Sequence, residues 1–358
     1  PLVPQDVELL VNNGHQVMIE SKAGEKANFD DHAYSEAGAT IAYSREEVYK
    51  ADILLKVEPL SHNEIDLLQH RQTLISALQL PVQPKNFLQK LIDKRVTAIA
   101  YDFIKDTSDR FPVIRAMSEI AGNTSILIAA EYLSNVNGGH GHMLGGISGV
   151  KPTEVVIFGA GAVAEFAARS ALGLGASVKV FSNNTSKLRR LQEGIGCRVY
   201  TSTLQPKVIE SALRTADVAI GAIRSETGRS PIVVTEEMVK QMQEGSVIVD
   251  VSIDQGGCFE TSKMTNHSEP TYELHGVTHY CVPNIASRVA RTASYALSNI
   301  LAPVILDLGE GGGVDNCIKN TYSIRSGIYL YRGMLTNRYL AEMFNLPYKD
   351  LDLLLAAI

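Results

Sequence analysis

The sequence predicts an α/β protein with parallel sheets, and three observations support this class. Strand-like and helix-like segments alternate through the first third of the chain, as successive βα units require. A short apolar run, 155–158, leads through a glycine turn into a helix-forming segment and then a second strand, 177–181. A third run, 247–254, is mostly apolar and β-branched, which is typical of a strand buried on both faces.

Length and composition predict a folded chain with two domains. It has 358 residues, of which 45% are hydrophobic and 20% charged, enough for a large core. The net charge of -6 argues against a nucleic-acid partner, because phosphate binding needs a basic surface. The sequence has no run of 18 apolar residues and no C-x-x-C pair among its four cysteines, so we expect no membrane span and a reduced, cytoplasmic setting. Pro1 at the start indicates a trimmed segment.

The first third of the chain is expected to alternate strands and helices. The predicted strands are 16–20, 53–57, 74–80 and 97–101, and the predicted helices are 7–12, 30–37 and 86–94. A long helix, 117–133, follows, and the segment 135–149 is predicted to be a loop because it carries six glycines.

The remainder continues the α/β pattern and ends in helices. The predicted strands are 155–158, 177–181, 218–222, 246–253 and 278–282. Residues 292–306 are expected to be helical, and so is the tail 320–358, where Tyr and Leu recur at helical spacing.

The turn Gly159-x-Gly161-x-x-Ala164 has the spacing of a dinucleotide-binding motif. Gly159 would let the chain turn tightly, Gly161 would leave room for a pyrophosphate, and Ala164 would let the helix approach the strand. The strand before the turn and the helix and strand after it favour nucleotide binding over an ordinary strand-to-helix turn. Main-chain N–H groups at the helix start would then favour an anion.

Asp254 ends the apolar strand 246–253 and precedes Gln255-Gly256-Gly257. Open α/β sheets bind ligands at the carboxyl ends of their strands, so Asp254 is a candidate site residue, although an Asp that only starts a turn would have the same position. We predict no metal site. His140 and His142 form an H-x-H pair in the glycine-rich loop without an evident third ligand.

Strings along most of the chain resemble the family of alanine dehydrogenase and the nucleotide-binding subunit of pyridine-nucleotide transhydrogenase, and alanine dehydrogenase most. They are 11–15, Lys56-Val57-Glu58-Pro59, 117–122, the glycine turn, 235–240, 245–257, 270–272 and 284–292. The resemblance implies two Rossmann-like domains, with a substrate domain, 1–124 and 300–358, built from both chain ends around an NAD(P)-binding domain, 125–299. It also implies a homo-oligomer, hexameric in the dehydrogenases, with a dimer as the other state considered.

The same resemblance implies roles for individual residues. Lys56 would contact substrate oxygens, and Asp254 would stand beside substrate and cofactor. Ser118, Ile253 and Asn284 would contact the cofactor. Without the resemblance, Lys56 would be an ordinary surface lysine and Ser118 an N-cap of the long helix. The family's substrate-binding arginine would lie before Val3.

Gln79 is a departure from the family. It stands where active alanine dehydrogenases carry a catalytic histidine on the strand 74–80. An amide can hydrogen-bond a carbonyl group but cannot exchange a proton near neutral pH. Loss of a general acid/base typically costs about 10²–10⁴-fold in rate, so we expect low alanine deamination.

Ser182 is a second departure. It occupies the place of the acid that binds the adenosine ribose in NAD-binding folds, and Lys187, Arg189 and Arg190 follow it. Without that carboxylate, a 2′-phosphate is no longer repelled. NAD is the expected cofactor and NADP an alternative, with a solvated helix face as the plain explanation of the basic residues.

These observations predict an NAD(P)-dependent amino-acid dehydrogenase of the alanine dehydrogenase type, acting on a small L-amino acid or 2-oxo acid with impaired activity. The alternatives are a nucleotide-binding paralogue without turnover, a dehydrogenase for another amino acid, and a transhydrogenase subunit.

Overall fold

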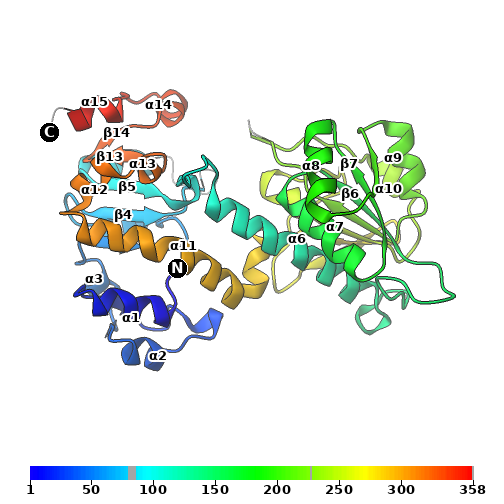
Figure 1. The fold of residues 1–358 in the computed structure, drawn as a ribbon, viewed down its shortest axis with the longest axis horizontal. Coiled ribbons are helices and arrows are strands. Elements are labelled where there is room, and N and C mark those ends of the chain that lie inside the picture. The colour runs from blue at the N-terminus through cyan, green and yellow to red at the C-terminus, as the bar shows by residue number, and fades with distance from the viewer. Residues whose placement is uncertain (80–85, 226–227, 357–358) are drawn as a thin grey trace. The chain divides into compact units, whose positions relative to one another are not determined.

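A computed structural model describes residues 1–79, 86–225 and 228–356 of the chain, which divides into two compact units (Figure 1). Unit 1 comprises Pro1–Ala116 and Ala290–Ile358, and unit 2 comprises Met117–Val289. The expected domain boundaries, 124/125 and 299/300, fall within two long helices, α6 (Pro112–Leu133) and α11 (Ala290–Glu310).

Unit 2 is built on a seven-stranded sheet with the order β11-β12-β10-β9-β6-β7-β8. All neighbouring strands are parallel except β11 and β12. The strands are β6 (Glu154–Phe158), β7 (Ser177–Phe181), β8 (Tyr200–Ser202), β9 (Val218–Gly221), β10 (Val247–Asp250), β11 (Thr271–Leu274) and β12 (Val277–Tyr280). The order β8-β7-β6-β9-β10-β12 is that of a dinucleotide-binding fold. In such a fold the direction in which successive strands are added to the sheet reverses between the first and fourth strands, here β6 and β9.

Helices cover both faces of this sheet, because successive strand residues point to opposite faces. Val155 and Ile157 pack in one cluster with Ala164 of α7, whereas Val156 and Phe158 pack with residues of α9. Figure 1 shows α7 and α8 near β6 and β7, with α9 and α10 beyond them. The helices, including 3-10 turns, are η4 (Asn135–Asn137), α7 (Ala162–Gly173), α8 (Thr185–Ile195), α9 (Pro206–Leu213), α10 (Glu236–Val239), η5 (Val251–Gln255) and η6 (Ile285–Val289).

Unit 1 contains a five-stranded sheet with the order β14-β13-β5-β4-β3 and a separate parallel pair, β1 and β2. Strands β3, β4 and β5 are parallel, and β13 runs antiparallel to β5 and β14. The strands are β1 (Met18–Glu20), β2 (Thr40–Ala42), β3 (Ile53–Leu55), β4 (Thr73–Ser76), β5 (Thr97–Ala100), β13 (Ile328–Tyr331) and β14 (Met334–Leu335). With the sheet of unit 2, this confirms the α/β class.

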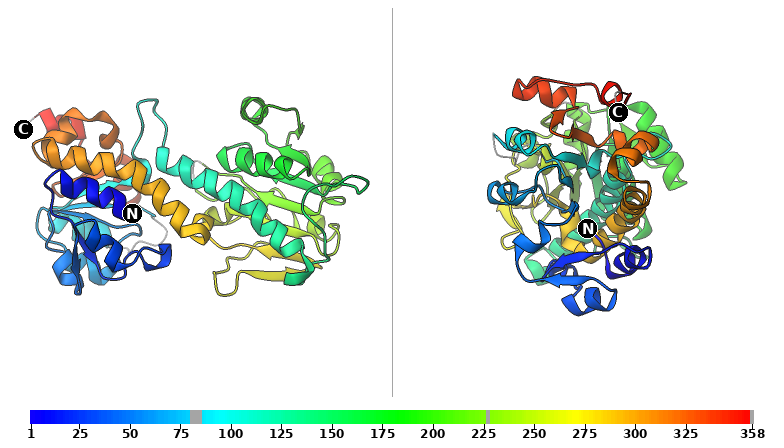
Figure 2. Two further views of the ribbon diagram at one scale, coloured as in Figure 1. Left: turned by 60° about the horizontal axis from the view of Figure 1, so that its bottom comes forward. Right: turned by 90° about the vertical axis from the view of Figure 1, so that its left-hand side faces the viewer.

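Helices from both parts of the sequence complete unit 1. They are α1 (Pro4–Asn12), η1 (Glu25–Ala27), α2 (Asp31–Glu36), α3 (Arg45–Val48), α4 (His62–Leu67), α5 (Phe87–Asp93), η3 (Tyr101–Phe103), α11, α12 (Val314–Asn320), α13 (Tyr322–Arg325), α14 (Arg338–Phe344) and α15 (Leu351–Ala356). Helices α1 and α11 lie side by side (Figure 2). The main-chain N–H of Val3 donates to Ser298 Oγ at 2.9 Å, so the two chain segments share one core.

The prediction of a helical tail was wrong at 328–335. Residues 328–331 form β13, and Arg332 and Gly333, both with positive φ, make a two-residue hairpin turn to β14. Strand β13 pairs antiparallel with β5, which is far away in the sequence. The spacing of Tyr and Leu within the tail carries no information about such a distant partner. Leu80, at the end of the predicted strand 74–80, and residues 357–358 of the tail lie outside the described residues.

The predicted strand 246–253 was too long at its carboxyl end. Strand β10 ends at Asp250, and Val251–Gln255 form the 3-10 turn η5. The chain turns there because the Asp250 carboxylate accepts the main-chain N–H of Ser252 at 3.0 Å.

Among the described residues, one helical stretch, Ile285–Glu310, has the length and apolar composition of a membrane span. Within it, Ala302 packs in a buried cluster with Val7 of α1 and with Val3, the N-cap of that helix. A core helix of a folded domain passes the same test, so this stretch is weak evidence for a membrane.

Candidate active site

The glycine turn lies at the carboxyl end of β6. Gly159 has a φ of +125°, and an added Cβ would stand 2.2 Å from the carbonyl oxygen of Ala222, so only glycine fits there. Gly161 is the N-cap of α7, and a Cβ added to it would meet no atom within 4 Å. Ala164 is fully buried beneath the turn. The space beside Gly161 is therefore open toward the first N–H groups of α7, which have no partner within the helix.

The carboxyl end of β10 is organised by Asp250, which is only 1% exposed. Its carboxylate accepts hydrogen bonds from the N–H groups of Ser252 (3.0 Å) and Cys258 (2.9 Å) and from Ser262 Oγ (2.6 Å). Burial raises the pKa of Asp250, although these hydrogen bonds oppose the shift. The side chain holds the turn η5 against the loop that follows it.

Asp254 lies on this turn and binds a second predicted site residue. Its Oδ1 accepts the main-chain N–H of Asn284 at 2.8 Å, and Asn284 has a φ of +50°. Ile253 beside it is buried. Asp254 is an exposed residue, yet desolvation by the protein packed around its carboxylate raises its pKa, and the nearby Asp250 carboxylate adds to the rise. Asp254, Asn284 and Ile253 thus come together at the edge that also carries the glycine turn.

The end of β7 is held by its own polar side chains. Ser182 follows β7, and its Oγ accepts the N–H of Asn184 at 3.2 Å. The Asn184 side chain caps α8 by accepting the N–H of Lys187 at 2.9 Å. The first turn of α8 carries no acidic residue. A hydroxyl therefore stands where an acid is usual, and the exposed ammonium of Lys187 lies in the first turn of the helix that follows.

Ser118 lies in the second turn of α6 and is not an N-cap, since the helix begins at Pro112. One turn later, a Cβ added to Gly122 would stand 2.5 Å from the carbonyl oxygen of Val163. Because residues four apart share a helix face, Ser118 lies on the face of α6 that approaches the start of α7.

In unit 1, Lys56 directly follows β3 and is held by a buried carboxylate. Its Nζ donates to Glu64 Oε1 and Oε2 at 2.7 and 2.8 Å. Glu64 also accepts the N–H of Ser61 at 2.7 Å, which closes the capping box of α4. Burial alone would raise the pKa of Glu64, but the bonds from Lys56 and Ser61 outweigh it and lower the pKa to about 2. Lys56 is thus a fixed ammonium at a sheet edge.

Gln79 lies three residues beyond β4 and is exposed, with a φ of +35°. Strands β3 and β4 are parallel neighbours, so Lys56 and Gln79 follow carboxyl ends at one edge of the unit 1 sheet. No other sequence-predicted site residue belongs to this unit.

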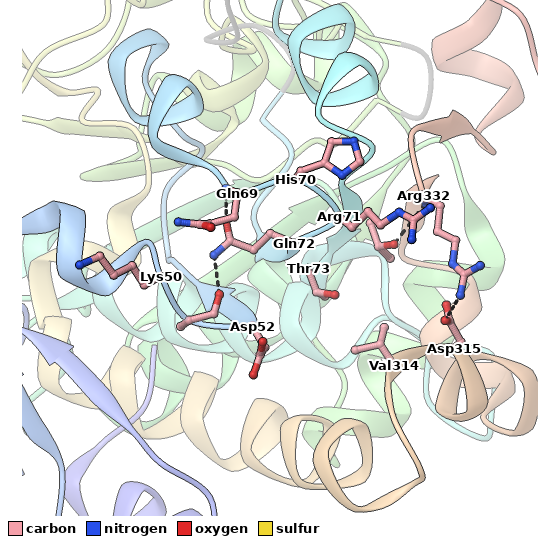
Figure 3. A pocket seen from close by; sticks show the side chains of 12 residues that line it. Lys50, Asp52, Gln69, His70, Arg71, Gln72, Thr73, Val314, Asp315 and Arg332 are labelled. Atoms are coloured by element: carbon pink, nitrogen blue, oxygen red, sulfur yellow. Dashed lines mark hydrogen bonds and ion pairs between the residues drawn. The ribbon is translucent and has the colours of Figure 1, made fainter.

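A polar hollow of about 400 Å³ lies elsewhere in unit 1 (Figure 3). Its lining includes Lys50, Asp52, Thr73, Thr97 and Arg332. Asp52, Thr73 and Thr97 stand at or just before the starts of β3, β4 and β5, at the edge opposite Lys56 and Gln79. The hollow is therefore separate from the predicted site residues of this unit.

Two residues that organise the site were missed from the sequence. Glu64 could have been found, because Ser61-x-x-Glu64 has the spacing of a capping box. Asp250 gave no such signal, because its partners Cys258 and Ser262 come from a later loop. Among the described residues, no group of three metal-ligating side chains occurs, and His142 contacts Asp217 at 3.2 Å.

Comparisons with known proteins agree along nearly the whole chain. The family model described as alanine dehydrogenase/PNT, C-terminal domain, matches residues 125–338, and the corresponding N-terminal domain matches 1–121. The sequence is 39% identical over 352 residues to alanine dehydrogenase 2 of Staphylococcus aureus (strain USA300), covering 98% of this chain and 94% of that protein.

Solved structures are similar as well. An L-alanine dehydrogenase superposes with a TM-score of 0.89 and 37% identity, over 96% of this chain and 94% of the other. A transhydrogenase from Sinorhizobium meliloti superposes with a TM-score of 0.78 over 94% and 95% of the two chains. Its 20% identity shows likeness of fold alone.

Proposed function

The chain belongs to the alanine dehydrogenase/PNT family, and we propose that it is an NAD(P)-dependent amino-acid dehydrogenase with impaired turnover. The reaction would be the reversible oxidative deamination of a small L-amino acid to a 2-oxo acid. The observation that carries the proposal is the glycine turn at β6, open at Gly161, with Asp254 and Asn284 at the same sheet edge.

A nicotinamide dinucleotide would supply the hydride acceptor or donor. The residues present fit such a group, because the space beside Gly161 is free of protein atoms and N–H groups at a helix start suit a diphosphate. The residues that would hold it are Ser118, Gly159, Gly161, Ala164, Ser182, Lys187, Ile253 and Asn284.

Lys56 would bind the carboxylate or carbonyl oxygen of the substrate. Its ammonium is fixed by Glu64, so it can orient an anion without first losing much side-chain freedom. A charge-assisted hydrogen bond of this kind contributes about 1.5–3 kcal/mol.

Asp254 would orient the substrate and take up a proton. Its raised pKa makes it a stronger base than an ordinary aspartate. Its Oδ1 holds Asn284, and among the described residues Oδ2 accepts no hydrogen bond. A carboxylate so placed can accept the proton released from an amine or carbinolamine.

Gln79 is the reason to expect impaired turnover. It can donate a hydrogen bond to a substrate carbonyl oxygen, but it cannot pass the proton that a histidine at this edge would exchange. We therefore expect alanine deamination about 10²–10⁴-fold below that of an enzyme with an acid/base group there.

The end of β7 supports use of NADP as well as NAD. Ser182 lacks the negative charge that would repel a 2′-phosphate, and exposed Lys187 stands in the first turn of α8. We expect NADH and NADPH to bind with similar affinities.

Gln79 and Ser182 also favour a second candidate, a nucleotide-binding paralogue without turnover. A dehydrogenase for a different amino acid is a further variant of the first proposal. Titration with NADH and NADPH, followed by fluorescence, tests the shared premise, and the chain has no tryptophan to interfere. Binding with slow NADH formation from alanine supports the dehydrogenase. Binding with no turnover across a panel of amino and 2-oxo acids supports the paralogue, and no binding contradicts both.

A cytoplasmic homo-oligomer completes the proposal, by analogy with the family. Sedimentation of the purified chain tests it, and we expect a species larger than the 38.9 kDa monomer.

A further inference from the structure

Lys56 is paired with the carboxylate of Glu64, which is more deeply buried than most acidic side chains. Glu64 is only 5% exposed, and its two oxygens lie 2.7 and 2.8 Å from Lys56 Nζ. Buried acids are rare in proteins, because an ionised carboxylate removed from water must be paired and hydrogen-bonded within the protein. The arrangement therefore calls for a reason beyond the folding of α4.

We propose that Glu64 is a positioning residue for substrate binding: it holds the Lys56 ammonium so that one N–H is directed to a substrate oxygen. This inference rests on the proposed function, in which Lys56 binds a 2-oxo acid. Glu64 itself would not touch the substrate.

The count of hydrogen-bond donors on Lys56 supports this role. An ammonium has three N–H groups, and the two Glu64 oxygens engage two of them. Within the described part of the chain, the third N–H has only the carbonyl oxygen of Pro59, at 3.5 Å, which is at the limit of a hydrogen bond. A substrate oxygen can take this N–H at little cost, and the Lys56 side chain remains 30% exposed to admit one.

Glu64 is itself fixed by groups other than Lys56. The N–H of Ser61 donates to Oε2 at 2.7 Å, and Arg45 Nη1 lies 3.5 Å from Oε1. The carboxylate therefore keeps its place and its charge, in line with a pKa of about 2. A fixed anion that holds a partly exposed cation is the arrangement expected of a preorganised binding group.

The variant Glu64→Gln separates positioning from folding. Glutamine also serves in a capping box, so its oxygen, in the place of Oε2, can keep the bonds from Ser61 and Lys56. Its NH₂ group, in the place of Oε1, removes the negative charge and one of the two acceptors that hold the Lys56 ammonium. Asp66→Asn is the matched control. Asp66 lies on the same helix and pairs with Lys90 at 2.6 Å, but it is 59% exposed.

Pyruvate binding to the NADH-saturated protein, measured by calorimetry without ammonia, tests the proposal on the intact chain. In Glu64→Gln we expect the affinity for pyruvate to fall about tenfold and the affinity for NADH to stay unchanged, because the residues proposed to hold NADH belong to unit 2. Asp66→Asn should change neither affinity.

The outcomes distinguish this inference from the proposed function. If Lys56→Ala weakens pyruvate binding but Glu64→Gln binds pyruvate as tightly as the wild type, or more tightly, the positioning role is wrong. If Lys56→Ala itself leaves pyruvate binding unchanged, the proposed role of Lys56 is wrong. An equal change in Asp66→Asn would show a general effect on α4 and would also contradict the positioning role.

Discussion

The carboxyl edges of the two parallel sheets carry different kinds of groups. In unit 2, the edge combines a strained glycine turn, the Asp250 network and the Asp254–Asn284 hydrogen bond. In unit 1, the edge combines the fixed Lys56–Glu64 pair with Gln79, an exposed amide. One edge thus offers backbone geometry and a carboxylate, whereas the other offers a cation but, at Gln79, a side chain that cannot exchange a proton near neutral pH.

This difference indicates which steps of the proposed reaction are retained. Ligand binding depends on backbone shape and on fixed charge. The glycine turn supplies the first at the unit 2 edge, and Lys56 supplies the second at the unit 1 edge. Proton exchange near neutral pH needs a titratable group, and Gln79 cannot supply it. The comparison predicts a protein that binds cofactor and substrate better than it turns them over.

The largest effect on binding is expected from Gly159→Ala, which changes the glycine turn at the unit 2 edge. Its Cβ would stand 2.2 Å from the carbonyl oxygen of Ala222, at a φ of +125°, so the turn must shift. We expect the affinity for NADH to fall about 100-fold or more, as measured by fluorescence titration on samples whose folding is checked by circular dichroism.

Gly173→Ala is the control for this substitution. Gly173 is the last residue of α7, the helix that follows the glycine turn, and an added Cβ would meet no atom within 4 Å. We expect unchanged NADH binding. A folded Gly159→Ala protein that binds NADH like the wild type would show that the turn does not hold the cofactor.

A smaller effect, on stability, is expected from Glu64→Gln in unit 1. The pKa of Glu64 is lowered from 4.5 to about 2, so its contribution is fully present above about pH 4.5 and is lost as the pH falls toward 2. The shift corresponds to about 3 kcal/mol, an upper value because Lys56 is 30% exposed and solvent screens the pair.

Urea unfolding at several pH values between 3 and 7 measures this contribution. The difference between wild type and Glu64→Gln should be largest near neutral pH and should shrink as the pH falls. A difference that is constant over this range, or that grows in acid, would contradict the ion pair.

The smallest effect is expected from Ser182→Asp, which restores the usual acid after β7. The new carboxylate would repel a 2′-phosphate and could accept a ribose hydroxyl group. We expect NADPH to bind about tenfold more weakly and NADH somewhat more tightly, measured by parallel titrations. Equal losses for both nucleotides would instead indicate damage to the cap at Asn184.

Local patterns predicted the parts of the fold that local interactions determine. The turn from β6 into α7 could be predicted because Gly159 and Gly161 lie only two positions apart in the sequence. Strand β13 could not, because its pairing with β5 involves residues far away in sequence. The early end of β10 depends on bonds from Asp250 to Cys258 and Ser262, which no periodicity encodes.

The site shows the same division. The family resemblance led to Lys56, and the end of a predicted strand led to Asp254, but the groups that hold these two residues are tertiary partners. Glu64 approaches Lys56 only because α4 folds back beside β3, and Asn284 meets Asp254 only because the loop after β12 takes a positive φ.

The central claim is that the chain binds its ligands but lacks a proton-exchanging group at position 79. Gln79→His tests it most directly, and histidine tolerates the positive φ found there better than most residues. The measurement is the rate of NADH formation from saturating NAD and alanine, for wild type and variant side by side. We expect the variant to be faster by about 10²–10⁴-fold. Rapid turnover by the wild type, with no gain in the variant, would contradict the account.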